Sequence, residues 1–258
     1  MRILVITEED EFYLPTSIDY LLENCGGKIL EVVCARNPLL PSKFKAASKF
    51  YKAFGLAPIL SQGLRLTKSK ILEALPWLNL AGRYYSVKRV CEAHNVPYLD
   101  CENINAPDFL RHCQELNIDL LASVSPTQIF KENLISMPKH GCINIHTAKL
   151  PEYRGLYPTY WAMASGEKTV GITIHYIEKG IDTGKIILQD EIEIHSGTTL
   201  DRMLTATKLK GAELLVQAIR QIAEGAVEAF YPEGEGSYFS FPTRQSYKEF
   251  KSLGYKLW

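Results

Sequence analysis

The stretch DLLASVSPTQIFKENLISMPKHGCINIH, residues 119–146, contains two short apolar runs separated by a more polar segment. The runs DLLASV (119–124) and GCINIH (141–146) have the length and composition of buried strands. Similar runs recur along the chain and alternate with stretches of helical periodicity. Because strands that alternate with helices build parallel sheets covered on both faces, we expect an α/β protein with a doubly wound, mostly parallel sheet.

The same periodicities predict the individual elements of this fold. The expected strands are residues 2–7, 29–35, 96–99, 119–124, 141–146, 169–177 and 185–194. The expected helices are residues 15–25, 86–95, 106–117, 158–166 and 198–224. The tail after residue 226 is rich in aromatic side chains and is expected to form a small appendage.

The charge of the chain is balanced overall but unevenly distributed. Lys+Arg and Asp+Glu both number 29, yet residues 36–90 hold eleven basic residues and one acid, Glu73. Such a local excess of one sign indicates a contact with anionic groups. The six cysteines form no C-x-x-C pair, which predicts buried reduced thiols in a cytoplasmic protein. The apolar run at the start, in MRILVITEEDEF, is too short for the hydrophobic region of a signal peptide, and acidic residues follow it at once.

Several classes of chemistry lack their sequence signals. Residues TEEDEF follow the first expected strand, where a dinucleotide-binding protein would carry its glycine motif. The chain has no P-loop and no G-x-S-x-G elbow. Its six histidines show no metal-ligand spacing, so no metal is expected.

Asn144 and His146 lie at the carboxyl end of an expected central strand, two residues apart. They therefore share one face of the sheet, at the edge where open α/β sheets bind ligands. An acid that could join them is Asp182, in the glycine-flanked turn EKGIDTGKIILQ. Taken alone, an Asn-x-His pair is more often structural, and turn chemistry would explain Asp182.

The pieces CINIHTAKLPEYRG and GITIHYIEKGIDTGKIILQDEIEI together resemble the formyltransferases that use N10-formyltetrahydrofolate as donor. This family includes methionyl-tRNA, glycinamide ribonucleotide and amino-sugar formyltransferases. The resemblance extends over residues 1–35 and 86–225, and Asp182 follows His146 by 36 residues, as in the family. It implies a Rossmann-like catalytic domain over residues 1–225 and an extension over 226–258. A basic helical insert over about 36–85 is not explained by the family.

The resemblance implies that Asn144, His146 and Asp182 are the catalytic residues. Formyl transfer to an amine passes through a tetrahedral oxyanion, which an imidazolium and an amide N–H stabilise. A neighbouring carboxylate favours the protonated imidazole and can accept the proton of the amine.

Further site residues are implied by the same family pattern. The donor contacts are expected at Ser123, Ser125, Pro126, Gln128, Ile129, Leu150, Pro151 and Gly180. The acceptor contacts are expected at Arg154, Gly155 and His175. The alternatives are an ordinary β-to-α loop over 122–130, an Arg154 that serves as a solvent-side clamp, and a strand histidine satisfied within the fold.

The acceptor is expected to be a small primary amine, and we favour a nucleotide-linked amino sugar that bears phosphate. The segment after the long helix is too short for the second barrel of a methionyl-tRNA enzyme, which disfavours tRNA. A formyltetrahydrofolate hydrolase and a catalytically silent binding protein remain alternatives.

The insert allows three interpretations. Its segment KFKAASKFYKAFG places Phe44, Ala47, Tyr51 and Phe54 on one helical face. The insert is a helical cover with a basic rim, a helix pair on an anionic membrane surface, or a funnel for an acidic ligand.

Overall fold

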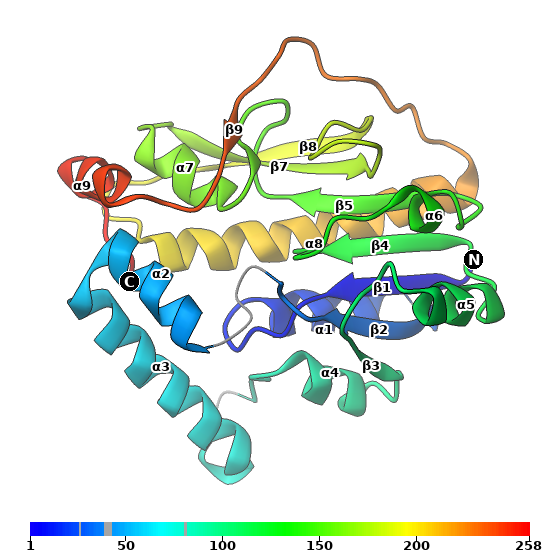
Figure 1. Ribbon diagram of the computed structural model, residues 1–258, viewed down its shortest axis with the longest axis horizontal. Helices are drawn as coiled ribbons and strands as arrows, with labels where there is room; N and C mark the ends of the chain where they lie inside the picture. Colours follow the sequence, from blue (N-terminus) through cyan, green and yellow to red (C-terminus); the bar gives the residue numbers. More distant parts are fainter. Residues whose placement is uncertain (26, 39–42, 80–81) are drawn as a thin grey trace.

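A seven-stranded sheet forms the centre of the computed structural model, which describes residues 1–25, 27–38, 43–79 and 82–258 (Figure 1). Its strands are β1 (Ile3–Thr7), β2 (Ile29–Ala35), β3 (Tyr98–Cys101), β4 (Leu120–Val124), β5 (Cys142–His146), β7 (Thr169–Tyr176) and β8 (Ile186–Glu193). Their order is β3-β2-β1-β4-β5-β7-β8. The first five in this order are parallel, and β7 and β8 continue the sheet antiparallel. The predicted mostly parallel α/β fold is confirmed.

Helices cover both faces of this sheet. One hydrophobic cluster joins inward side chains of the strands to α1 (Leu14–Cys25), α4 (Val87–Ala93) and α8 (Leu200–Glu224). On the other face, a second cluster joins them to α5 (Pro107–Glu115) and α6 (Glu132–Ile135). Burial on both faces explains why the strands are nearly continuous apolar runs. No helix among the described residues is long and apolar enough to cross a membrane.

Most expected elements occur close to their expected bounds, and β2 matches them at both ends. The strand expected at 96–99 is shifted to Tyr98–Cys101 because it pairs with residues Val32–Ala35 of β2. All six cysteines are unpaired, and all except Cys101 are buried, as predicted.

The insert folds into α2 (Lys43–Phe54), α3 (Leu56–Ala74) and the 3-10 turn η1 (Pro76–Leu78). Residues 39–42 and 80–81 of the expected insert lie outside the described residues. The apolar face predicted for α2 is buried only at Phe54, whereas Phe44 and Tyr51 of that face are exposed and Ala53, outside it, is buried. The ring of Phe54 contacts Tyr160 and Tyr247 edge-on, at centroid distances of 5.8 and 5.2 Å. The side of α2 that is buried is thus determined by contacts with aromatic residues far away in the sequence, not by the spacing of apolar residues along the helix.

The tail after α8 returns across the molecule and packs against β6 (Arg154–Gly155) and α7 (Pro158–Ala164) (Figure 1). Strand β9 (Tyr238–Phe239) pairs with β6, directly after the loop that follows β5. Helix α9 (Arg244–Ser252) then contributes Phe250 to a cluster with Tyr160 and Met163 of α7. The tail therefore supports the loop at the end of β5, and its division from residues 1–225 as a separate extension stays a prediction.

Candidate active site

Asn144 and His146 lie buried at the carboxyl end of β5 on one face of the sheet. Asn144 lies between Ser123 of β4 and His175 of β7, its partners on the neighbouring strands. These side chains share the face that carries the α5 and α6 cluster, and they begin where its apolar contacts end. The parity of the strand thus produces a polar row at the ligand-binding edge of the sheet.

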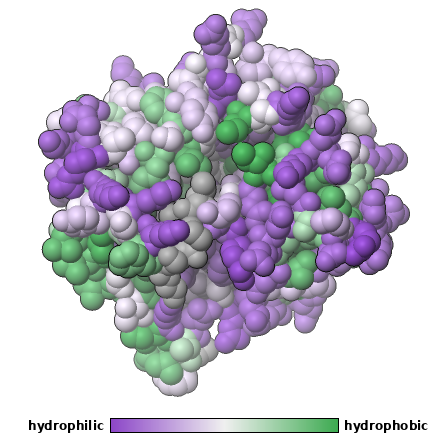
Figure 2. Space-filling view, viewed as in Figure 1, coloured by the Kyte–Doolittle hydropathy of each residue, from purple (hydrophilic) through white to green (hydrophobic). Residues whose placement is uncertain are grey.

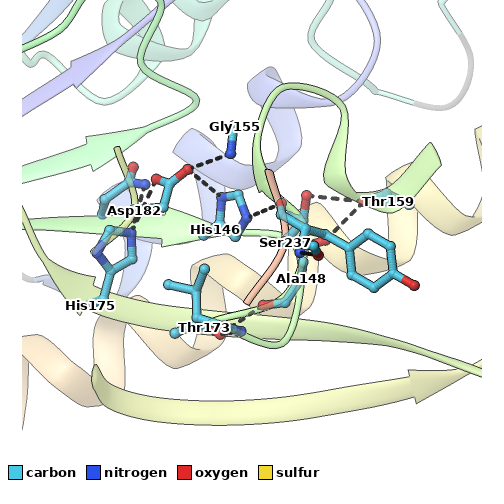
Figure 3. Close-up of polar contacts among 12 residues, drawn as sticks. His146, Ala148, Gly155, Thr159, Thr173, His175, Asp182 and Ser237 are labelled. Carbon is cyan, nitrogen blue, oxygen red and sulfur yellow. Dashed lines mark hydrogen bonds and ion pairs between the residues drawn. The ribbon is translucent and has the colours of Figure 1, made fainter. Parts of the chain in front are cut away.

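Asp182 reaches this row from the turn between β7 and β8 (Figure 3). Its Oδ2 atom lies 3.6 Å from His146 Nδ1, and its Oδ1 atom lies 3.6 Å from His175 Nε2. The backbone N–H of Gly155 donates a hydrogen bond to Oδ2 at 2.8 Å. Asp182 itself has a φ of 53°, in the left-handed region that Asp tolerates better than most residues. The turn therefore aims one carboxylate between two imidazoles.

His175 is held as a neutral imidazole. Its Nδ1 atom lies 2.8 Å from the carbonyl oxygen of Tyr176, so that nitrogen carries the proton. Burial lowers the pKa of His175 to about 4, the Asp182 carboxylate opposes this change, and His146 adds to it. The free lone pair on Nε2 accepts an N–H of the Asn144 amide at 3.2 Å. The neutral ring thereby fixes which way the amide of Asn144 points.

The ring of His146 is fixed by a different carbonyl. Its Nε2 atom lies 2.9 Å from the carbonyl oxygen of Tyr153, and a carbonyl can only accept. Nε2 is therefore the protonated nitrogen, and Nδ1 faces Asp182. Tyr153 holds this carbonyl in place with a φ of 57° and with its own N–H bonded to Ser237 Oγ at 2.9 Å.

Two buried polar atoms without a hydrogen-bond partner lie on neighbouring strands at this edge. They are Asn144 Oδ1 and Ser123 Oγ. Unpaired buried polar groups are costly, and they are found where a ligand supplies the missing partner. The edge can therefore accept a polar ligand that supplies the missing hydrogen-bond partners.

Some of the residues expected to contact the donor lie near Asn144, and others do not. Ser123 lies in β4 opposite Asn144, and Ser125 and Pro126 follow directly after this strand. Gln128 instead bonds within the fold, since its amide donates to the carbonyl oxygens of Arg36 and Glu102 at 2.9 and 3.0 Å. The side chain of Ile129 is exposed.

Leu150, Pro151 and Gly180 occupy the two loops beside Asn144 and Asp182. Leu150 is buried, and its N–H donates to Thr173 Oγ1 at 3.2 Å. The Leu150–Pro151 bond is cis. A hollow of about 290 Å³ lies beside this loop and is lined by Leu150, Pro151 and Tyr153, but it does not include the polar row. Gly180 has a φ of 120° and lies against Thr183, which the turn before Asp182 requires.

Arg154 and Gly155 serve the fold at this edge, while His175 joins the polar row. Arg154 donates to the carbonyl oxygen of Glu235 at 3.0 Å and so binds the tail. A Cβ atom on Gly155 would lie 2.3 Å from the carbonyl oxygen of Phe239, so only glycine allows β6 to pair with β9. Their expected contacts with the acceptor stay predictions.

Sequence reasoning missed two half-buried groups of opposite charge beside this edge, Glu8 and Lys208. Lys208 of α8 donates to Ser125 Oγ, and Glu8 follows β1. Burial raises the pKa of Glu8 to about 7, Asp10 adds to this change, and Lys208 opposes it. Burial also lowers the pKa of Lys208, against the effects of Glu8 and Asp10. The acidic residues of TEEDEF were visible in the sequence, but only the fold shows that Lys208 of α8 lies near them.

Chemically, this edge combines hydrogen-bond donors with a carboxylate that can accept a proton. Asn144 retains one amide N–H beyond its bond to His175, and His146 carries its proton on Nε2. Donors of this kind stabilise a developing oxyanion. Among the described residues, no three His, Cys, Asp or Glu side chains are grouped to hold a metal ion.

Similarity to known proteins covers the part of the chain that contains this site. The sequence model of the family described as formyl transferase matches residues 77–219, which contain Asn144, His146 and Asp182. A methionyl-tRNA formyltransferase of Pelotomaculum thermopropionicum is 35% identical over 152 residues, covering 59% of this chain and 49% of its own length. One of Clostridium beijerinckii is 36% identical over 155 residues, with 60% and 49% covered. The chain thus spans about half the length of the curated relatives it matches.

Solved structures share the fold over most of this chain. A sugar N-formyltransferase from a Shewanella species has a TM-score of 0.59 at 18% identity, covering 93% of this chain and 76% of its own. A glycinamide ribonucleotide transformylase from Symbiobacterium toebii has a TM-score of 0.61 at 18% identity, with 92% of each chain covered. These likenesses show the fold, and the family match spans more than half of the sequence. The chain belongs to the formyl transferase family.

Proposed function

We propose that this protein transfers a formyl group from N10-formyltetrahydrofolate to the primary amine of a small acceptor. The observation that carries the proposal is the Asp182 carboxylate, 3.6 Å from both His146 and His175, with the Asn144 amide beside them. The unpaired buried atoms at Ser123 and Asn144 support a polar donor at the same edge. Family membership supports the type of reaction.

In the proposed reaction the acceptor nitrogen attacks the formyl carbon, which becomes tetrahedral. The remaining amide N–H of Asn144 and the Nε2–H of His146 donate to the oxygen that gains negative charge. For His146 this means sharing the proton that now binds the Tyr153 carbonyl. Asp182 accepts the proton that the attacking amine loses, directly or through water. The bond between the formyl carbon and N10 then breaks, and N10 takes up a proton.

His175 has a supporting part in this proposal. As a neutral ring with its proton on Nδ1, it has no proton to give at Nε2. Its lone pair holds the Asn144 amide so that the second N–H of the amide faces the reacting group. Ser123, Ser125 and Pro126 are the proposed donor contacts nearest to Asn144.

For the acceptor we favour an amino sugar on a nucleotide carrier. A sugar N-formyltransferase shares the fold over 93% of this chain. Methionyl-tRNA is the second candidate, because the relatives that are 35 and 36% identical are named for that acceptor. The proposed phosphate of the nucleotide would not lie at the loop after β1, where Glu8 and Asp10 lie together.

The test is a spectroscopic assay for consumption of formyltetrahydrofolate, with nucleotide amino sugars, methionyl-tRNA or no acceptor. We expect consumption that depends on an amino sugar and is lost in His146→Ala. Consumption with methionyl-tRNA alone would select the second candidate. Formate release without any acceptor would identify a hydrolase, and no donor consumption or binding would refute formyl transfer.

A further inference from the structure

The outer face of α3 is apolar and open to solvent. Four of its large side chains, with their exposed fractions, are Leu56 (59%), Leu60 (60%), Leu64 (74%) and Ile71 (48%). At 3.6 residues per turn, they fall within an arc of about 80° along a helix of 19 residues. Trp77 (71%) and Leu78 (49%) follow immediately after the helix. We call these six residues the α3 stripe.

The inner face of α3 carries polar anchors beside half-buried apolar side chains such as Leu66 and Leu72. Arg65 forms an ion pair with Asp201 of α8 and lies between two aromatic rings. Its guanidinium carbon is 4.7 Å from the ring centre of Phe12 and 4.9 Å from that of Trp258.

Two further polar anchors follow along the same face of α3. One turn beyond Arg65, Ser69 is buried, and Glu73 accepts a hydrogen bond from Ser86. These contacts fix the orientation in which Leu56, Leu60 and Leu64 face solvent.

Lysines flank the α3 stripe on both sides. With roughly 100° per residue, Lys68 lies about 40° beyond Leu64, and Lys70 lies about 40° before Leu56. Both lysines are exposed. Residues 43–79 contain seven basic residues and one acid, and that acid is the bonded Glu73. An apolar arc with lysines at its edges matches helices that lie in the plane of a membrane interface, where lysine stems extend toward lipid headgroups.

We propose that the α3 stripe lies on an anionic lipid surface. Figure 2 shows hydrophobic side chains gathered along the lower left edge of the molecule, where Figure 1 places α3. A second copy of this chain is the less fitting occupant. It would bring two sets of Lys68 and Lys70 against each other, whereas anionic headgroups attract them. Trp77 lies at the end of the stripe, as aromatic side chains do at membrane interfaces.

The location of α3 relates the proposed lipid contact to the end of the sheet that carries Asn144 and His146. Helices α2 and α3 lie at the end of the molecule toward which β1, β4 and β5 point (Figure 1). A lipid surface against the α3 stripe would therefore lie at the same end as Asn144 and His146. The proposal is independent of formyl transfer, because neither rests on the residues of the other.

The test is flotation of the 258-residue chain with phosphatidylglycerol-rich vesicles and with phosphatidylcholine vesicles at low salt. We expect binding to the anionic vesicles only, and at least about a tenfold loss of partitioning in Leu60→Gln/Leu64→Gln. Lys68→Gln/Lys70→Gln should reduce binding to the anionic vesicles as well. The matched control is Leu253→Gln, another exposed leucine, at the end of α9, which should bind like the wild type. A circular dichroism melt of each variant shows that it folds.

Three outcomes would overturn the proposal. The first is no flotation with phosphatidylglycerol-rich vesicles. The second is equal flotation of the wild type and Leu60→Gln/Leu64→Gln. The third is a dimer in sedimentation velocity that this double variant dissociates, without vesicle binding, which would assign the stripe to a second copy. A blue shift of tryptophan fluorescence on vesicle binding, lost in Trp77→Phe, is the corresponding positive result.

Discussion

The carboxyl end of β5 and the outer face of α3 invert the usual distribution of side chains in opposite ways. At β5, Asn144 and His146 are buried, whereas on α3, Leu60 and Leu64 are exposed. Buried polar side chains and contiguous exposed apolar ones are the two informative departures from ordinary burial. In both regions, contacts with neighbouring residues hold the side chains in these unusual environments. Function is expected at such places.

The means of enforcement differ between the two regions. At β5, hydrogen bonds from strands and turns hold the buried polar side chains in place, as between Asn144 and His175. On α3, the enforcing contacts lie behind the surface, at Arg65 and Asp201, and the leucines themselves are exposed. The first region should therefore be sensitive to single polar substitutions, and the second should tolerate them in solution.

The largest effect is expected for Asp182→Asn. The amide can still accept the N–H of Gly155, so the turn should persist, but it cannot take up a proton. We expect turnover to fall by about 10²–10⁴. Single-turnover formyl transfer measures this loss.

Asp190→Asn is the matched control for this substitution. Asp190 is a half-exposed carboxylate of β8 that pairs with Lys210 at 2.8 Å. It should keep its turnover within about a factor of two, as expected for a surface ion pair. Equal losses in the two variants would remove Asp182 from the mechanism.

The second effect concerns stability against pH and rests on His175. Its pKa is about 4 in the folded protein against about 6.5 in an unfolded chain, so the unfolded state binds more protons between these values. The contribution of His175 to the free energy of unfolding is therefore fully present above about pH 6.5 and is lost as the pH drops toward 4, by on the order of 3 kcal/mol. His175→Gln should lack this part of the acid loss. Urea unfolding at about pH 5 and about pH 8 measures it.

His195→Gln provides the comparison, because His195 is exposed beside Glu193 at the end of β8. This variant should keep the acid loss of the wild type. If His175→Gln keeps it too, then His175 is not the neutral group that holds Asn144, and its assigned proton on Nδ1 is wrong.

The two regions also differ in what their sequences reveal. Strand parity predicts that Asn144 and His146 share one face of the sheet, whereas Asp182 joins them only through the resemblance to the formyltransferases. The exposure of Phe44 and Tyr51 on α2 could not be predicted, since the orientation of the helix follows from the contacts of Phe54 with Tyr160 and Tyr247, which are far away in the sequence. Lys208 was missed for the same reason, because a lysine in a long helix is ordinary until the fold places it beside Glu8 and Ser125.

Lys208→Met is expected to have a smaller effect than the first two substitutions. It removes the bond that holds Ser125, at the start of the loop proposed to bind the donor. Loss of one charge-assisted hydrogen bond should raise KM for the donor about tenfold and leave kcat within about twofold. Steady-state kinetics against donor concentration separate the two constants.

Lys210→Met, two residues away on α8, removes an exposed ion pair with Asp190 instead. Its KM for the donor should match that of the wild type. A fall in kcat without a change in KM in Lys208→Met would instead place Lys208 in the chemical step.

The smallest effect is expected on α3 and tests the comparison most directly. Leu60 is exposed, so Leu60→Gln should change the free energy of unfolding by less than about 0.5 kcal/mol in solution. Ile145 is buried beside His146. The substitution Ile145→Ala should lower the free energy of unfolding by about 2–5 kcal/mol, because it removes buried apolar surface and leaves a cavity. Chemical denaturation without lipid measures both. A loss at Leu60 as large as that at Ile145 would mean that another part of the protein covers the α3 stripe in solution, and the inversion on α3 would then be ordinary packing.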